Sequence, residues 1–452
     1  MFKRWPWVWA VILSVGFVTA SAQTPETSHP SQTPRSSQAR GASQASQTLT
    51  LKEAEAIALK NHPQVQAAQL TALASYQALR ETRAAYYPTL TADVTGTAAD
   101  RDTRIGAGFF TNPRILSRFA QGITLTQLIT DSGRTPNLVA SSKLTAQAQD
   151  QNAQATRYDV LLRVDQAYFN ALRAQALVKV AQQTVASRQL VLDQVTALAK
   201  SKLKSELDVT FAAVNLAEAK LLLIGALNDV DKSFAELSRA LGFQEEQRYV
   251  LVDEPLPPET PPDPNALVQE ALNQRPELIG QRLSRDAAYK FERAERDLSF
   301  PTVSLVGAAG FIPEVSNLIP VPNHYDAAAI NVDIPIFNGH LFAARRAAAR
   351  LRAQAEDQRL RDLEDRIARD VRAAWADSTT AFQRLAVTEQ LLQQATLSLD
   401  LAQARYKLGL GSIVELSQAQ LSLTQAQIEQ ASARYDYQSQ RSMLDYQVGV
   451  LR

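Results

Sequence analysis

The chain has 452 residues, with 47 Lys and Arg against 46 Asp and Glu, and no cysteine. So balanced a charge argues against a protein that binds nucleic acid through its phosphates. The absence of cysteine excludes disulfides, a Cys-containing metal site, a thiol nucleophile and a lipid anchor on an N-terminal Cys.

The N-terminus has the pattern of a secretory signal peptide. Lys3 and Arg4 precede an apolar stretch, and Ala-Ser-Ala at 20–22 forms a small-residue cleavage site, which predicts a signal peptide at residues 1–22. A membrane-anchor helix is the alternative, but the apolar run is shorter than the roughly 20 residues that a span needs. Residues 23–48 are rich in Ser, Gln, Thr and Pro and predict a disordered tether.

The first folded segment combines helix and strand patterns. Residues 50–86 show a helical spacing of apolar residues, interrupted by Pro63. A β-hairpin is expected at about 88–130, because residues 89–95 alternate apolar and polar side chains and a second alternating segment follows. The polar, glycine-rich residues 100–118 between these strands predict a loop.

The longest predicted element follows this hairpin. Residues 134–200 contain no proline after Pro136 and no glycine, which predicts one helix of about 65 residues, roughly 100 Å long. Small and apolar residues recur at alternating spacings of four and three, a coiled-coil seam interrupted at Arg188. A second apolar stripe indicates neighbours on two sides. A shorter helix is expected over residues 206–241, ended by Gly242.

The second half predicts the same plan. The proline-rich segment 243–263 is expected to be a semi-rigid linker. It is followed by a helix at 265–298 with Pro276 near its start, a hairpin at about 300–337, and a long helix from 339 to about 407. A final helix runs to Val448. Two shorter helices placed end to end have about the same length as one long helix. Helices of equal total length could form the wall of a cylinder of constant height.

Short motifs recur between the halves at a nearly constant separation. The pairs are 59–63 with 272–276, 87–90 with 300–303, 205–209 with 412–416, and 241–242 with 448–449. A repeat of this size is too long for a solenoid unit. It predicts a duplicated half-molecule, with one repeat at 49–242 and another at 264–452.

The four predicted strands are the main indication of function. Each has about 10 residues and alternates apolar with polar side chains, as transmembrane β-strands do. Aromatic residues at their ends are typical of a membrane interface: Tyr86, Tyr87, Phe300 and Phe337. We expect no later apolar stretch of ~18 residues, so a membrane crossing would use strands. Four strands cannot close a barrel, and eight is the practical minimum, so this interpretation requires an oligomer.

Six short motifs mark helix starts, hairpin entries and the second long helix: 61–63, 275–277, 87–88, 300–301, 334–339 and 405–416. In their order, spacing and duplication, they resemble the TolC family of outer-membrane efflux proteins over nearly all of residues 49–449. The resemblance implies a mainly α-helical chain with transmembrane β-strands. It implies a homotrimer with a 12-stranded barrel in the outer membrane and a long α-helical barrel in the periplasm.

The resemblance also implies a function and partners. The chain would be the exit duct of a tripartite efflux or type I secretion system, passing substrates from an inner-membrane pump and a periplasmic adaptor to the outside. It would be surrounded by outer-membrane lipid and would need no cofactor. The alternative from the residues alone is an exported coiled-coil scaffold that never enters a membrane, its strands forming a small soluble sheet.

Three residues at the helix tips match family gate positions. Asp208 and Tyr406 match an aspartate and a tyrosine that help hold the closed tip together, and Glu415 matches an acidic position whose symmetric ring selects cations. The simpler alternative for both carboxylates is a solvated charge that favours the helix dipole. Gln418 stands where a second gate aspartate is common, which makes the ring less acidic. Adaptor docking is expected at the tips: Lys202, Leu203, Lys204, Leu408, Gly409, Leu410, Gly411 and Ser412.

The sequence has no sign of catalysis. Its four histidines are not paired at a metal-binding spacing, and no nucleophile elbow or phosphate loop occurs. Ser132, between Asp131 and Gly133, is expected in a turn, and Trp375 is expected in packing. We therefore predict no enzyme, no metal site and no cofactor, while the exported substrate stays open between drug, metal, solvent and polypeptide.

Overall fold

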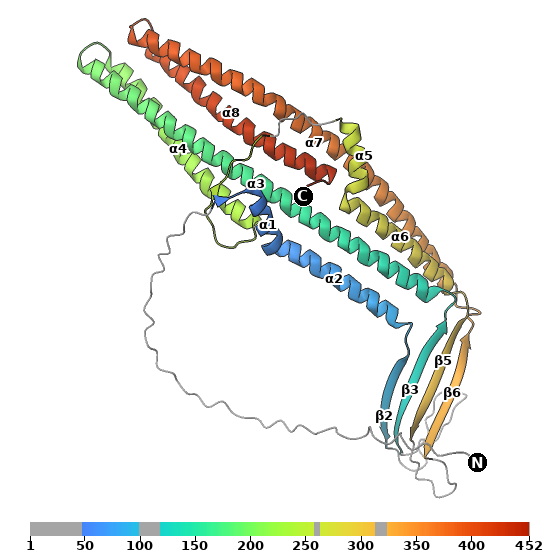
Figure 1. The fold of residues 1–452 in the computed structure, drawn as a ribbon. Helices are drawn as coiled ribbons and strands as arrows, with labels where there is room; N and C mark the ends of the chain where they lie inside the picture. Colours follow the sequence, from blue (N-terminus) through green and yellow to red (C-terminus); the bar gives the residue numbers. More distant parts are fainter. Residues whose placement is uncertain (1–47, 99–117, 257–262, 312–322, 452) are drawn as a thin grey trace, which may run out of the picture. The chain divides into compact units, whose positions relative to one another are not determined.

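The computed structural model describes residues 48–98, 118–256, 263–311 and 323–451 (Figure 1). These residues belong to one compact unit, Ser46–Arg452. The predicted signal peptide lies outside the described residues, as do the predicted tether up to residue 47 and most of both hairpin loops.

The same order of elements occurs twice along the chain. The first half contains α1 (Leu51–Asn61), α2 (Pro63–Ala84), β2 (Thr89–Thr97), β3 (Arg118–Thr130), α3 (Arg134–Lys200) and α4 (Glu206–Ala240). The second contains α5 (Pro264–Gln274), α6 (Pro276–Asp297), β5 (Thr302–Phe311), β6 (His324–Asp333), α7 (Leu341–Lys407) and α8 (Ile413–Val448). The two long helices, α3 and α7, have 67 residues each, so the predicted long helices are confirmed.

A proline divides the first helical segment of each half. Proline lacks a backbone N–H and fits the first turn of a helix, so it starts a new helix instead of continuing the old one. Pro63 begins α2 after His62, whose ring nitrogen accepts a hydrogen bond from the Gln64 N–H at 3.2 Å. Pro276 begins α6 after Arg275, so the single helix expected at 265–298 is two helices.

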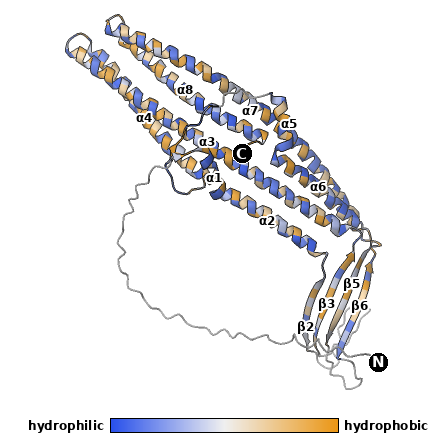
Figure 2. Cartoon of the chain, in the orientation of Figure 1, coloured by the Kyte–Doolittle hydropathy of each residue, from blue (hydrophilic) through white to orange (hydrophobic). Residues whose placement is uncertain are grey.

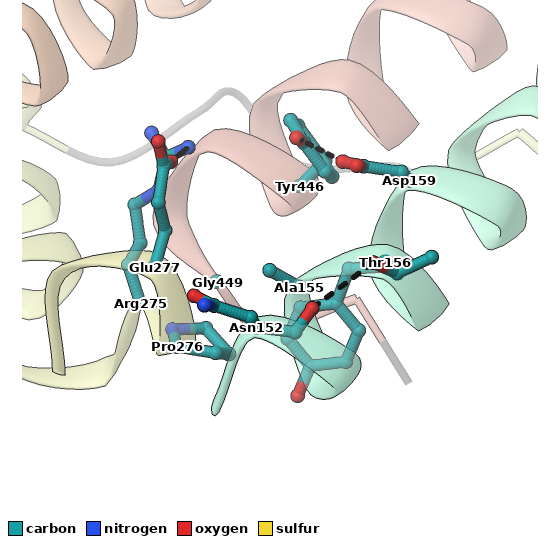
Figure 3. A pocket seen from close by; sticks show the side chains of 10 residues that line it. Asn152, Ala155, Thr156, Asp159, Arg275, Pro276, Glu277, Tyr446 and Gly449 are labelled. Atoms are coloured by element: carbon teal, nitrogen blue, oxygen red, sulfur yellow. Dashed lines mark hydrogen bonds and ion pairs between the residues drawn. The ribbon is translucent and has the colours of Figure 1, made fainter. Parts of the chain in front are cut away.

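The repeated glycines pack against these two breaks. Gly242, with φ +85°, follows α4, and a Cβ added there would lie 2.9 Å from the Cα of His62. Gly449, with φ +86°, follows α8, and its Cβ would lie 3.3 Å from the Cα of Arg275 (Figure 3). Only glycine combines this backbone conformation with so close an approach. Two motifs that are far apart in each half therefore form one structural joint.

The segment predicted as a linker contributes to the core. Its residues Val250–Leu251 form β4, which pairs in parallel with β1 (Thr48–Leu49). Tyr168 of α3 is fully buried beneath this pair. Its hydroxyl oxygen lies 2.8 Å from the carbonyl oxygen of Leu49 and 2.6 Å from that of Val252. The segment is thereby tied to the longest helix.

Helix α3 contacts α1, α2, α4, α6 and α8, which confirms the prediction that it packs on more than one side. Helix α7 contacts α5, α6 and α8. Two helical hairpins result, α3 with α4 and α7 with α8, and they meet through α3 and α8 (Figure 1).

The expectation that no later stretch of about 18 residues is apolar was wrong for one helix. Among the described helices, α4 is long and apolar enough to cross a membrane by length and composition alone. Only 22% of its apolar window is buried in the single chain. Its exposed apolar side chains include Leu207, Leu221 and Ile224. Polar residues interspersed along α4 had concealed its high mean hydropathy.

The four long strands form one antiparallel sheet in the order β2-β3-β5-β6 (Figure 1). The register pairs Leu90 with Leu125, Leu125 with Gly307, and Leu305 with Ile330. Because side chains alternate between the faces of a strand, these residues share one face. Apolar residues occur along all four strands (Figure 2), and the predicted alternation is confirmed.

Candidate functional site

The first helix tip joins α3 to α4 through residues 201–205. Lys202 has a left-handed φ of +60°, which costs a non-glycine residue roughly 1–2 kcal/mol. Gly409 takes the corresponding position in the second tip, with φ +74°. Ser205 caps α4: its hydroxyl accepts from the Asp208 N–H at 3.2 Å, and the Asp208 carboxylate accepts from the Ser205 N–H at 3.2 Å. This capping box holds the carboxylate at the helix start.

The second tip holds a bridged carboxylate. The Ser412 hydroxyl accepts a hydrogen bond from the Glu415 N–H at 3.1 Å, which caps α8. Arg405 of α7 donates from Nε to Glu415 Oε1 at 3.0 Å and from its terminal nitrogen to the Leu410 carbonyl oxygen at 3.2 Å. A Cβ at Gly411 would lie 3.2 Å from the side chains of both Arg405 and Glu415. The glycine therefore lets this ion pair close over the turn.

Tyr406 lies between the two tips. Its side chain is only 7% exposed and packs in a cluster with Val195 and Leu416. The Lys204 ammonium of the first tip stands 4.2 Å from the centre of its ring, a cation–π contact. Burial raises the pKa of the Tyr406 hydroxyl, and the negative charge of Asp208 raises it further.

The structure thus places the three predicted gate residues in two settings. Asp208 and Tyr406 are neighbours across the tips, although the Tyr406 hydroxyl has no hydrogen-bond partner among the described residues. Glu415 is paired within its own tip with Arg405. Sequence reasoning assigned Arg405 no role, and it did not use the capping patterns Ser-x-x-Asp and Ser-x-x-Glu, which were the available signal.

The residues predicted for adaptor docking form an exposed apolar surface. Leu203 of the first tip and Leu408 and Leu410 of the second are each about 70% exposed. Exposed leucines at the end of a helical hairpin have no partner in the single chain. Such a surface fits a protein contact better than it fits free solvent.

The sheet ends carry aromatic residues. The predicted group, Tyr86, Tyr87, Phe300 and Phe337, is exposed at the end next to the helices. A second group stands at the far end, which sequence reasoning missed: Phe119, Phe311 and Tyr325. The side chain of Tyr325 lies across Gly122 and Gly310, where any other residue would collide with it. Both ends of the sheet therefore carry aromatic rings, as the two interfaces of a membrane barrel do.

A buried acid lies in the helical region, away from the tips. Asp165 of α3 is 2% exposed and faces Glu55 of α1 and Asp445 of α8. Burial, followed by the charge of Glu55, raises the pKa of Asp165 to about 8. Burial raises the pKa of Glu55 as well. At neutral pH the pair therefore retains a proton.

The described residues contain no group of three or more His, Cys, Asp or Glu side chains placed to hold a metal ion. A cavity of about 230 Å³ near the α5–α6 break is lined by residues that include Arg275, Glu277, Asp159 and Tyr446 (Figure 3). Arg275 is ion-paired to Glu277 at 3.0 Å, and the Tyr446 hydroxyl donates to Asp159 at 2.5 Å. These groups satisfy one another, which suits a structural joint.

The family profile described as "Outer membrane efflux protein" matches residues 56–243 and 267–450. The chain belongs to this family. The resemblance read from the motifs is confirmed, and the chain is an outer-membrane efflux protein whose family members are channels.

Curated relatives agree over most of the chain. The outer membrane protein TolC of Salmonella enteritidis is 25% identical over 425 residues, covering 91% of this chain and 84% of that protein. The alkaline protease secretion protein AprF of Pseudomonas aeruginosa is 26% identical over 434 residues, covering 89% and 85%. One relative is thus named for the outer membrane and the other for protein secretion.

Solved structures show the same fold. A membrane protein from Pseudomonas aeruginosa matches with a TM-score of 0.77 at 22% identity, covering 88% of this chain and 93% of that one. The CmeC outer membrane channel of Campylobacter jejuni matches with a TM-score of 0.77 at 18% identity, covering 89% and 86%.

Proposed function

We propose that this protein is the outer-membrane exit duct of a tripartite efflux or type I secretion system. The observation that carries the proposal is the sheet: four strands with one apolar face and aromatic residues at both ends, continuous with helices of 67 residues. An exported scaffold would not need an apolar face on all four strands. A lipid-facing barrel wall does need it.

We propose a homotrimer with a shared 12-stranded barrel. In the described sheet, β2 and β6 each have one neighbour, so each presents an unpaired edge. Unpaired backbone groups are too costly in lipid for an open sheet to exist there. A single chain therefore cannot cross the membrane alone. Three copies, the number that the family resemblance implies, would join edge to edge into a closed barrel. The exposed apolar side chains of α4 support further contact between chains.

The helices would then form a barrel on the periplasmic side, with the tips at its far end. Chain connectivity supports this placement, since the strands and the tips lie at opposite ends of α3 and α7. The exposed leucines of the tips would dock on a periplasmic adaptor bound to an inner-membrane pump. Asp208, Tyr406 and Glu415 would form the gate, and three copies of Glu415 around one axis would favour cations.

The domain organisation follows the repeated element order. Residues 49–242 and 264–452 would be the two efflux repeats, joined by 243–263, with a signal peptide at 1–22 and a tether at 23–48. Helices α3 and α7 have the same length, and α1 and α5 have 11 residues each. These equal lengths support duplication of one ancestral half.

The proposal is tested by purifying the mature chain from membranes in detergent and measuring its protein mass by light scattering, with the detergent contribution subtracted. We expect three chains per particle and detergent-dependent extraction. The same particles should conduct ions in a planar bilayer. A soluble monomer or dimer would overturn the shared barrel and restore the exported scaffold.

A further inference from the structure

A polar cavity lies where the two helical hairpins meet. It measures about 150 Å³ and is lined by four residues of α3, one of α7 and four of α8. The lining includes Thr184, Ser187 and Arg188 of α3 and Gln420 and Thr424 of α8. The described residues that line it include no carboxylate and one positive charge.

Arg188 is the central feature of this cavity. The sequence pattern treated it as an interruption of a coiled-coil seam, yet its side chain is only 6% exposed. It makes no hydrogen bond or ion pair among the described residues. Glu218 of α4, which lines an adjoining cavity of about 320 Å³ with Arg188, is an opposite charge that acts on the guanidinium but forms no ion pair with it. A buried charge without a bonded partner is strongly unfavourable.

Gln420 is a second, independent unsatisfied group. Its side chain is 4% exposed, and its Nε2 donor has no partner within the described residues. The neighbouring hydroxyls donate elsewhere, Thr184 to the Val180 carbonyl at 2.8 Å and Thr424 to the Gln420 carbonyl at 3.0 Å, and neither accepts a hydrogen bond from Nε2. Buried donors without partners indicate a missing acceptor.

The two buried groups of the cavity that lack a partner, the Arg188 guanidinium and the Gln420 Nε2, are both donors. A guanidinium presents five N–H groups in a planar fork, which matches two oxygens of an oxyanion better than a spherical ion. Gln420 adds an amide donor from the opposite helix, and the exposed residue Ser187 adds a hydroxyl to the lining. A cation would meet only repulsion from Arg188.

We propose that the cavity between Arg188 and Gln420 binds a small tetrahedral oxyanion of the phosphate or sulfate class. The anion accepts hydrogen bonds from α3 on one side and from α8 on the other. Because α3 and α8 belong to different hairpins, the bound anion joins the two hairpins and opposes their separation. This site does not depend on the proposed duct function.

The test uses the mature full-length protein in detergent, in a buffer free of oxyanions and at constant ionic strength. Inorganic phosphate is titrated by isothermal calorimetry, with chloride as the matched anion. Arg188→Leu and Gln420→Leu remove one donor group each. Arg173→Leu is the control, since Arg173 also links α3 to α8, through an ion pair with Asp436 at 3.0 Å outside the cavity.

We expect saturable phosphate binding in the wild type and in Arg173→Leu. Binding should weaken about tenfold or more in both cavity variants, the factor expected for one lost charge-assisted hydrogen bond. If Arg188→Leu does not fold, Gln420→Leu carries the comparison. Absent binding in the wild type, equal binding in Gln420→Leu, or an equal response to chloride would each overturn the proposal, and none of them would affect the duct function.

Discussion

Gly242→Ala tests the joint between α4 and the α1–α2 break. A residue with a Cβ at φ +85° costs roughly 1–2 kcal/mol in the left-handed region. The new methyl group would also stand 2.9 Å from the His62 Cα and 3.0 Å from two further backbone atoms. Since backbone atoms cannot rotate away, the packing cost is about 1–3 kcal/mol. After the smaller entropy gain in the unfolded chain, we expect a net loss of about 2–4 kcal/mol.

The measurement is a urea titration of the purified variant in detergent, followed by far-UV circular dichroism. Gly225→Ala is the matched control: Gly225 lies inside α4, no heavy atom is within 4 Å of its added Cβ, and its φ is not left-handed. Helix propensity predicts that this control gains about 0.5–1 kcal/mol. Two variants with the same chemical change should therefore shift in opposite directions.

Equal midpoints for Gly242→Ala and Gly225→Ala would refute this reasoning, because the joint would then tolerate a methyl group. Gly449→Ala provides a graded case. Its added Cβ approaches Arg275 no closer than 3.2 Å, so its loss should lie between those of the other two variants.

Three further predictions concern the sheet, the tip and the buried acid. Leu305→Arg should place a charge on the apolar face, which costs about 2–4 kcal/mol near the bilayer midplane, and should abolish membrane-inserted protein. Ser304→Arg, on the opposite face, should insert normally. Equal yields of the two variants in outer-membrane fractions would contradict this. Glu415→Gln should weaken cation preference in single-channel recordings, and unchanged selectivity would remove Glu415 from the gate. Because burial raises the pKa of Asp165 to about 8 from an ordinary value near 3.8, its stabilising contribution is complete below about pH 4 and is lost as the pH rises through about 8. Asp165→Asn should therefore reduce the dependence of the urea midpoint on pH across that window. A pH dependence identical to that of the wild type would exclude Asp165 as its source.

Local signals predicted the helices well. Residues 134–200 form one helix because proline and glycine are absent from its interior and Gly133 precedes it. Ser205 and Ser412 were a further local signal that the prediction did not use: each serine side chain satisfies a free backbone donor at the start of α4 or α8. The alternation of the strands was equally local, since their side chains change face at every residue.

Residues whose role depends on a partner in space were misread or missed. Arg188 looked like a defect in a seam, but it is buried between two hairpins that the sequence does not show in contact. Arg405 was part of a recognised motif, yet only the turn at Gly411 brings it to Glu415. Tyr406 meets Lys204 because the two tips lie side by side.

The sequence by itself determined the repeated order of elements, their lengths, the apolar face of each strand and the family. These features depend on periodicity, capping and breaking residues, which act over a few positions of the chain. The tertiary structure decided which repeated motifs touch, as at Gly242 and His62, and which charges are buried without partners, as at Arg188. It did so because close approach and desolvation are properties of packed helices, and no spacing along the chain records them.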